Sequence, residues 1–217
     1  MEIEFVEPKN IEKRSFEIIT KELKEDYDTI LDAEKAPLIL RAIHTSADFS
    51  YAKTLYFSPD IIDNARKALV EGATIVTDTS MALSGINKKV LSDLGINYHC
   101  FIADDDVARE AKERGVTRSS VSMERAAKID GPLILVIGNA PTALIKIREL
   151  YDEKKIDPQL VIGVPVGFVN VVPAKDLIVE SGMPCIVNRG RKGGSNVAAA
   201  LINALIYTFR AEREALK

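Results

Sequence analysis

His44 is one of only two histidines in the 217-residue chain. An apolar helical run that includes Leu40 and Ile43 leads into it, and a polar and aromatic segment that includes Asp48 follows. Imidazole changes its charge near neutral pH, so a histidine held at the end of a packed element suits acid or base catalysis. Single histidines at helix ends are more often capping or core residues, so this position alone does not assign chemistry.

A second segment with chemical potential combines glycines with three cations. It reads Arg-Gly-Arg-Lys-Gly-Gly-Ser-Asn over residues 189–196. Glycines let the backbone approach a ligand, and the free N–H groups at a helix start attract anions. The spacing matches neither a phosphate loop nor a dinucleotide fold. A plain glycine turn is the alternative, but three adjacent cations favour an anion site, with Gly194 and Ser195 binding the ligand and Ser195 or Asn196 capping the helix.

Three further polar segments are candidates for ligand contact. Thr79 lies in a polar cluster after a strand-like run, and Asn139 is expected to cap a helix that begins near Pro141. Arg118 begins a helix, where the dipole disfavours a cation, so its position indicates an anionic partner. The three aspartates at 104–106 fit the usual acidic first turn of a helix, and we predict no metal site there.

The elements that would position these residues follow an α/β pattern. After Gly72, short apolar runs alternate with helices, which is typical of a parallel sheet covered on both faces. We expect strands over residues 74–77, 97–102, 132–137, 160–164 and 184–188, and helices over 80–94, 106–114, 119–129, 141–153, 174–180 and 195–212. Such sheets bind ligands beyond the carboxyl ends of their strands, where the polar segments fall.

The first third of the chain reads as helical. Helices are expected over residues 11–23, from 32 or 33 to 44, and from an N-cap at Ser58 to a stop before Gly72. We therefore predict a single α/β domain over residues 1–217. Its N-terminal helical part, about 10–72, would pack on an α/β part, 73–217, with a mainly parallel sheet of five or slightly more strands.

Composition excludes several classes of partner. A formal charge of −3 lacks the basic excess of nucleic-acid-binding proteins. No apolar run approaches the roughly 20 residues that cross a bilayer, and the first residues do not read as a secretion signal. Cys100 and Cys185 lie far apart in strand-like runs, as expected of buried thiols in a reducing cytosol. The predicted location is cytoplasmic, without nucleic-acid or membrane partners.

Seven motifs together resemble a known family. They are RSF at 14–16, RAIHTSADF at 41–49, FSP at 57–59, TRS at 117–119, GNAPTAL at 138–144, GVPVGFV at 163–169 and GRKGGS at 190–195. This combination resembles precorrin-8X methylmutase, also called cobalt-precorrin-8 methylmutase, from about residue 10 to 205. Some members follow the histidine with Ala-Cys-Gly, whereas this chain has Thr45-Ser46-Ala47, so no thiol acts there.

The resemblance implies an isomerase of cobalamin (vitamin B12) biosynthesis. Such an enzyme moves a methyl group of precorrin-8 or cobalt-precorrin-8 from the α carbon of ring C to the neighbouring β carbon. This 1,5-sigmatropic shift gives hydrogenobyrinate or cobyrinate. The resemblance also implies a Rossmann-like α/β fold, no organic cofactor, a homodimer, and a histidine corresponding to His44 at ring C.

The same resemblance suggests how the substrate would be held. Arg14, Ser15 and Arg118 match family positions that we expect to contact carboxylates or the ring edge. Strand-end geometry adds Thr79, Asn139, Gly194 and Ser195 as substrate-binding residues, and an aromatic wall is expected from Phe49, Tyr51 and Tyr56. As an imidazolium, His44 would donate a proton or a hydrogen bond to the ring C nitrogen.

Two readings from other classes remain open at this point. A non-catalytic tetrapyrrole carrier would use the same pocket for tight product binding. A nucleotide-dependent oxidoreductase on a similar fold is the second alternative, and the absence of a GxGxxG motif argues against it.

Overall fold

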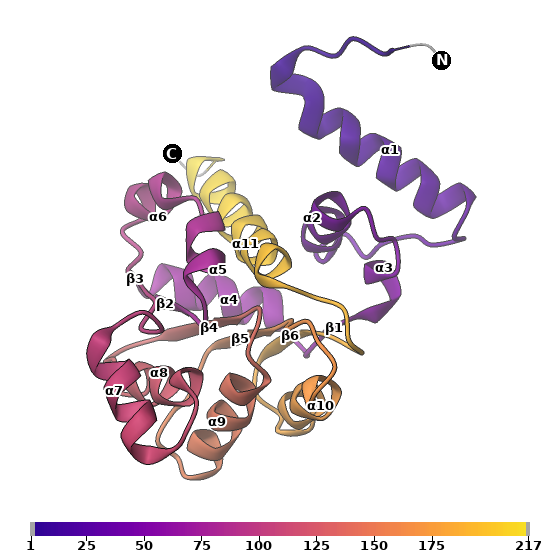
Figure 1. The fold of residues 1–217 in the computed structure, drawn as a ribbon. Coiled ribbons are helices and arrows are strands. Elements are labelled where there is room, and N and C mark those ends of the chain that lie inside the picture. Colours follow the sequence, from indigo (N-terminus) through magenta and orange to yellow (C-terminus); the bar gives the residue numbers. More distant parts are fainter. Residues whose placement is uncertain (1–2, 216–217) are drawn as a thin grey trace.

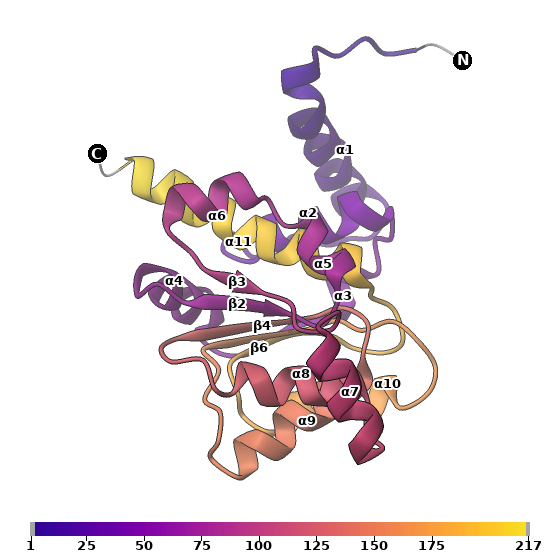
Figure 2. The same cartoon turned by 60° about the vertical axis from the view of Figure 1, so that its left-hand side comes forward.

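A twisted sheet lies between two layers of helices (Figures 1 and 2). The computed structural model describes residues 3–215. The strands lie in the order β1-β6-β5-β4-β2-β3, and all neighbours are parallel except β1 and β6. Their bounds are β1 Leu55–Phe57, β2 Thr74–Thr77, β3 Tyr98–His99, β4 Leu133–Ile137, β5 Leu160–Gly163 and β6 Cys185–Asn188. The predicted α/β class, with a mainly parallel sheet, is confirmed.

Most helices connect one strand to the next. After a short 3-10 turn at Pro8–Asn10, they are α1 Ile11–Glu25, α2 Ala36–Ser46, α3 Tyr51–Thr54, α4 Ile61–Val70, α5 Ser80–Gly85, α6 Lys88–Leu94, α7 Asp105–Arg114, α8 Arg118–Ala126, α9 Pro141–Asp152, α10 Val171–Glu180 and α11 Ser195–Ala215. Among the described residues, no helix is long and apolar enough to cross a membrane.

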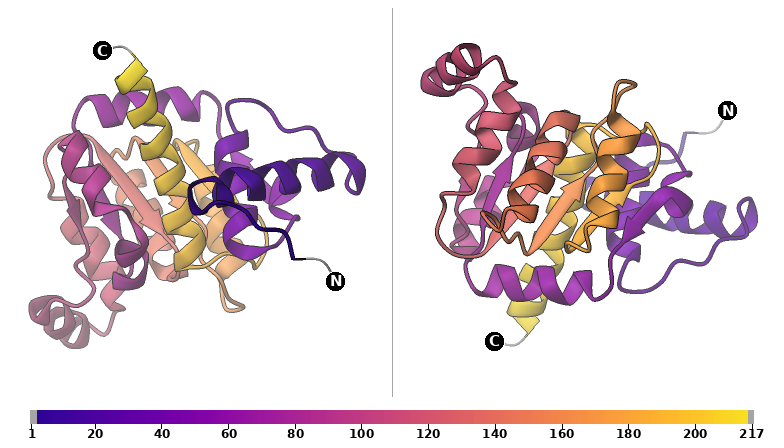
Figure 3. Two further views of the ribbon diagram at one scale, coloured as in Figure 1. Left: turned by 90° about the horizontal axis from the view of Figure 1, so that it is seen from above. Right: turned by 90° about the horizontal axis from the view of Figure 1, so that it is seen from below.

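Successive side chains of each strand point to opposite faces of the sheet and so belong to two separate hydrophobic cores. Ile134 and Val136 of β4 pack with α2, α4, α6 and α11 on one face. Leu133, Leu135 and Ile137 of the same strand pack with α8, α9 and α10 on the other. Figure 3 shows these two helical layers from opposite sides of the sheet. Both faces of the sheet are buried under helices, which explains the apolar runs in the strand sequences.

The first two helices lie on the outside of one layer. α2 packs on α11, and α1 packs on α2 and projects from the rest of the molecule (Figures 1 and 2). Ile19 and Leu23 of α1 are buried against this layer, whereas Ile11 and Ile18 are exposed. The helical N-terminal part therefore shares the core of one sheet face. The first two and last two residues of the predicted 1–217 domain lie outside the described range.

Several predicted boundaries are wrong for tertiary reasons. Ser58 does not cap α4, because its backbone and hydroxyl exchange hydrogen bonds with Cys185 and extend the pairing of β1 with β6. The edge strand β1 itself was not predicted. The expected helix 80–94 is interrupted at Ile86, and Asn87 caps α6 by accepting from the Val90 N–H at 3.2 Å. The expected strand 97–102 pairs only at Tyr98–His99.

Candidate functional site at the carboxyl edge of the sheet

The strand order places two loops side by side at the carboxyl edge. β2 and β4 are neighbours, yet β2 leads to α5 on the α11 face and β4 leads to α9 on the opposite face. Ligands of open α/β sheets bind at such a reversal of direction. The polar segments after β2 and β4, which contain Thr79 and Asn139, therefore meet at the position where a ligand is expected.

Asp78, directly after β2, fixes the turn that follows β4. Its buried carboxylate accepts hydrogen bonds from the backbone N–H groups of Gly138, Asn139 and Ala140 at 2.9, 2.8 and 2.7 Å. Burial raises the pKa of Asp78, and the three N–H donors oppose that rise. Asn139 is therefore not the predicted helix cap. Its side chain is exposed, and Ala140 holds the cap position of α9.

Thr79 and Ser195 meet beside this turn. Their hydroxyl oxygens lie 2.9 Å apart, and the Thr79 oxygen also accepts from the Ala82 N–H at the start of α5. A Cβ at Gly138 would lie 2.6 Å from the Ser195 Cα, so only glycine lets α11 begin this close to β4. Ser195 is the first residue of α11 and pairs with Thr79 instead of capping the helix.

Arg118 begins α8 at the same edge of the sheet, as predicted. The Thr117 hydroxyl caps α8 by accepting from the Ser120 N–H, and it donates to the Thr142 hydroxyl at 3.0 Å in the first turn of α9. The Arg118 side chain is exposed, and within residues 3–215 it forms no ion pair. A cation without an acidic partner at a helix start is available to a carboxylate ligand.

The glycine-rich segment forms a turn, which we call the cationic turn (residues 189–194), between β6 and α11. The Gly194 N–H donates to the Val164 carbonyl at 2.9 Å. Arg189 lies over the Tyr56 ring at 5.0 Å and Arg191 over the Phe168 ring at 5.3 Å. The aromatic faces hold the guanidinium groups without neutralising their charge, so both cations remain available to anions.

His44 lies in the last turn of α2, and its ring is exposed. Its nearest aromatic neighbour is Phe16 of α1, at 5.6 Å and 87° between the rings. Arg41, one turn earlier, lies between the rings of Phe16 and Tyr207. Among residues 3–215, no hydrogen bond or ion pair occupies the imidazole, so both ring nitrogens are open to a ligand.

An ion pair joins the loop after His44 to the cationic turn. The Lys192 Nζ lies 2.6 Å from the Asp48 carboxylate and 3.0 Å from the Ser50 hydroxyl. Burial alone would raise the pKa of Asp48, but hydrogen bonds from Lys192 and Ser50 outweigh it and lower the pKa below its usual value. The α2 end and the cationic turn are therefore held to each other.

Arg14 and Ser15 lie apart from this cluster within the chain. Both are on α1, where Arg14 pairs with Glu4 at 2.8 Å and the Ser15 hydroxyl donates to the Ile11 carbonyl. Neither side chain bonds to a strand-end turn in the part of the chain that the structure describes. The expected aromatic wall is also incomplete: Tyr51 is buried, which raises its pKa to about 12.

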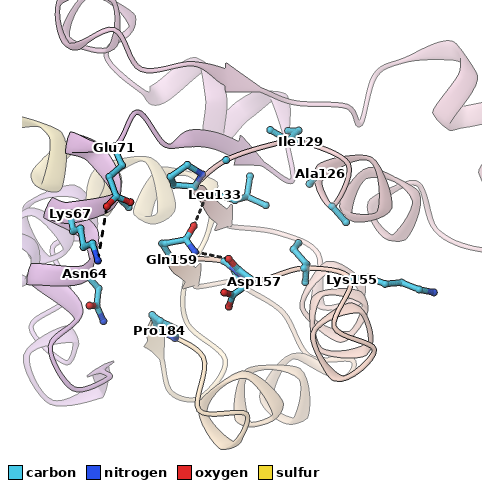
Figure 4. Close-up of a pocket in the computed structure, with 16 residues that line it drawn as sticks. Asn64, Lys67, Glu71, Ala126, Ile129, Leu133, Lys155, Asp157, Gln159 and Pro184 are labelled. Atoms are coloured by element: carbon cyan, nitrogen blue, oxygen red, sulfur yellow. Dashed lines mark hydrogen bonds and ion pairs between the residues drawn. The ribbon is translucent and has the colours of Figure 1, made fainter.

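A cavity of about 590 Å³ lies at the opposite, amino edge of the sheet (Figure 4). Several of its polar groups contact one another. Lys67 lies 4.0 Å from Glu71, and Gln159 accepts from the Leu133 N–H and donates to the Asp157 carbonyl. None of the motif residues lines it. Chemistry-bearing side chains gather at the carboxyl edge, and we place the candidate site there.

Comparison with known proteins agrees with this chemistry. The family model for precorrin-8X methylmutase matches residues 10–208. The chain belongs to the precorrin-8X methylmutase family. A cobalt-precorrin-8 methylmutase from Salmonella typhimurium is 42% identical over 208 residues, covering 94% of this chain and 97% of the relative. One from Priestia megaterium is 42% identical, with 92% and 88% covered.

A solved precorrin-8X methylmutase from Thermus thermophilus has the same fold, with a TM-score of 0.82 at 32% identity. It covers 94% of this chain and 98% of that one. The chain is thus a methylmutase of cobalamin biosynthesis, an isomerase that transfers a methyl group within one molecule, as its motifs predict.

Proposed function

We propose that His44 is the acid of the methyl shift on ring C of precorrin-8 or its cobalt form. The observation that carries the assignment is an exposed imidazole that has no partner within residues 3–215, on an α2 end that is joined to the cationic turn. Three charged groups near this end, Arg41, Asp48 and Lys192, already have partners. His44 is the titratable group left for the substrate.

The shift is an isomerisation, so atoms and electrons balance within the substrate. The bond from the methyl carbon to the α carbon of ring C breaks as the bond to the neighbouring β carbon forms. An imidazolium at the ring C nitrogen would withdraw electrons from the migrating system, and the proton is shared in the transition state. Such acid catalysis typically supplies about 100- to 10,000-fold in rate.

The carboxylates of the tetrapyrrole bind, in this proposal, to the strand-end turns. The N–H groups of residues 190–193 and of Ser195, in the first turn of α11, offer donors and positive potential, whereas the Gly194 N–H is taken by the Val164 carbonyl. Arg118 adds an unpaired cation from α8, while Thr79 and Asn139 offer polar side chains from the two adjoining loops. This arrangement accounts for an anion site on a chain of net charge −3.

We also propose that the enzyme is a homodimer and that α1 contacts the second copy. α1 projects from the body (Figure 2), and an open groove of about 880 Å³ runs along it from Lys9 to Lys24. Its rim alternates in sign, with Glu12 and Glu17 among four lysines. Such a surface is complementary to its own two-fold copy. Arg14 and Ser15, on the same helix, would then act close to the interface.

The central experiment compares turnover and binding in two histidine variants. His44→Ala should lower kcat on precorrin-8 or its cobalt form by about 100- to 10,000-fold, with the dissociation constant of the methyl-migrated product within a few-fold of wild type. His99→Ala removes the other histidine, which is exposed and stacked on Phe101. It is the matched control and should retain wild-type turnover.

Equal turnover by wild type and His44→Ala would refute the acid assignment. A wild-type protein that binds product but converts neither substrate would support the carrier alternative. Sedimentation of wild type and of Thr20→Arg, a change at an exposed residue that lines the groove, tests the dimer. The variant should shift to monomer, and an unchanged sedimentation coefficient would remove the α1 groove from the interface.

A further inference from the structure

The cationic turn is held by its backbone. Its carbonyl groups point inward: Arg191 O accepts from the Gly167 N–H at 3.2 Å, and Lys192 O accepts from the Asn188 side chain at 2.8 Å. Asn188 is fully buried and is itself oriented by the Thr54 hydroxyl, 2.6 Å from its Oδ1. The N–H groups of residues 190–193 donate to no protein acceptor within residues 3–215.

Lys175 of α10 is the charged group at the centre of this arrangement. It is only 1% exposed, and its Nζ donates to Gly190 O at 2.8 Å and to Lys192 O at 2.9 Å. Buried ammonium groups are rare because removing the charge from water is unfavourable unless partners compensate. Here two carbonyls compensate. An apolar side chain would fill the same space, so stability alone does not explain a lysine.

We propose that Lys175 is a positioning residue for substrate binding. It fixes the orientation of the peptide groups in the cationic turn, so that their carbonyls face the protein and their N–H groups face the substrate carboxylates. This inference rests on the proposed role of the turn as an anion site. Lys175 does not touch the substrate. Its ammonium binds the Gly190 carbonyl, which has no other donor within residues 3–215, and shares the Lys192 carbonyl with Asn188. It also adds a positive charge behind the turn.

The test replaces Lys175 with methionine, which keeps the chain length and apolar volume but removes the charge and the donors. The expected result is about a tenfold rise in KM and in the product dissociation constant, with kcat within about twofold of wild type. Ile178→Ala is the matched control, because it creates a cavity on the same helix without touching the turn. It should lower stability and leave KM unchanged.

Chemical rescue separates positioning from packing. Lys175→Ala should recover product affinity when n-propylammonium is added, since this ion replaces the missing atoms and donors. Tetramethylammonium has the same charge but no N–H group and should not restore affinity.

If Lys175→Met does not fold, Lys175→Gln, which keeps an N–H donor, serves in its place. We expect it to bind product more weakly than wild type, and wild-type affinity would contradict the inference.

Arg191→Gln distinguishes failure of this inference from failure of the proposed site. If Arg191→Gln weakens product binding and a folded Lys175 variant does not, the turn binds carboxylates but Lys175 does not position it. If neither change alters product affinity, the cationic turn is not part of the site and both proposals fail. Weaker binding in both variants, with rescue of Lys175→Ala by n-propylammonium alone, supports both.

Discussion

Two strand-to-helix turns lie at the carboxyl edge of the sheet, and a buried charge of opposite sign fixes each one. Asp78 holds three backbone N–H groups of the turn after β4. Lys175 holds two backbone carbonyls of the cationic turn after β6. The N–H groups of the first turn therefore bond inside the protein, whereas those of residues 190–193 have no acceptor within residues 3–215. Of the two turns, only the cationic turn therefore has backbone N–H groups available to an anion.

The difference shows that a glycine-rich turn does not define an anion site by itself. Both turns contain glycine and both precede helices. The group that sets the orientation lies elsewhere in the chain, 60 to 62 residues before the first turn and 15 to 17 residues before the second. The buried counter-group determines which backbone atoms reach the ligand.

Removing the anchor of the first turn should have the largest effect on stability. Asp78→Ala leaves three backbone N–H groups, two of them in buried hydrogen bonds, without an acceptor. We expect it to lower the free energy of unfolding by about 3–5 kcal/mol. Urea denaturation measures this loss. A single transition is expected for wild type from the prediction that residues 1–217 form one domain. A loss below about 1 kcal/mol would mean that Asp78 does not anchor the turn.

A pair of glycine variants tests how tightly the second turn is placed. A Cβ at Gly193 would lie 2.0 Å from the Val164 carbonyl oxygen, so Gly193→Ala should cost about 2–3 kcal/mol and weaken product binding. Gly190→Ala is the control. Its φ of 81° is unfavourable for alanine, but no atom lies within 4 Å of the new Cβ, so about 1 kcal/mol is expected. Equal effects would show that the turn is free to move.

The buried Lys175 predicts a specific dependence of stability on pH. Burial lowers its pKa from 10.5 to about 8, with Asp176 acting in the opposite direction. Between about pH 8 and pH 10.5 the unfolded chain binds more protons than the folded protein. The lysine's contribution to the free energy of unfolding should therefore rise with pH, by about 2.5 kcal/mol between pH 7 and pH 10. Below pH 8 this contribution should be constant.

Denaturation of wild type and Lys175→Met at pH 7, 9 and 10 isolates this contribution. The stability of wild type relative to the variant should increase across this range. A difference that stays constant or falls with pH would show that Lys175 is not a buried ammonium at neutral pH, and the contrast between the two turns would lose one of its anchors.

The smallest effect is expected at Asn139, where only the side chain is free for the substrate. Asn139→Ala removes a single hydrogen bond in our account, worth about 1 kcal/mol, so KM should rise about fivefold without a change in stability. Steady-state kinetics and thermal unfolding measure the two quantities. A large loss of stability would instead identify Asn139 as a structural residue of the turn.

Sequence patterns predicted the sheet, its strands after β1, and the loops at their carboxyl ends. They also placed His44 at a helix end and Arg118 at a helix start. They failed where a tertiary partner decided the local structure: Ser58 bonds to Cys185, and Asp78 fixes a turn in which Ala140, not Asn139, holds the cap position. Strand β1 has three residues and no local signal, because its pairing with β6 is entirely long-range.

Lys175 shows why the site was only partly predictable. Its position in a helix of mixed composition resembles an ordinary surface lysine, and only the packed structure reveals that it is buried against the cationic turn. The roles of Arg14, Ser15, Arg118 and the strand-end residues in substrate binding stay predictions, as does the dimer.

A crystal structure of the enzyme with its methyl-migrated product would test the account most directly. We predict that the macrocycle lies at the carboxyl edge, with an imidazole nitrogen of His44 within hydrogen-bond distance of the ring C nitrogen. Carboxylates should accept from the N–H groups of the cationic turn, and the N–H groups of residues 138–140 should remain on Asp78. A product bound in the cavity at the amino edge, or carboxylates bound by the Asp78 turn, would contradict the account.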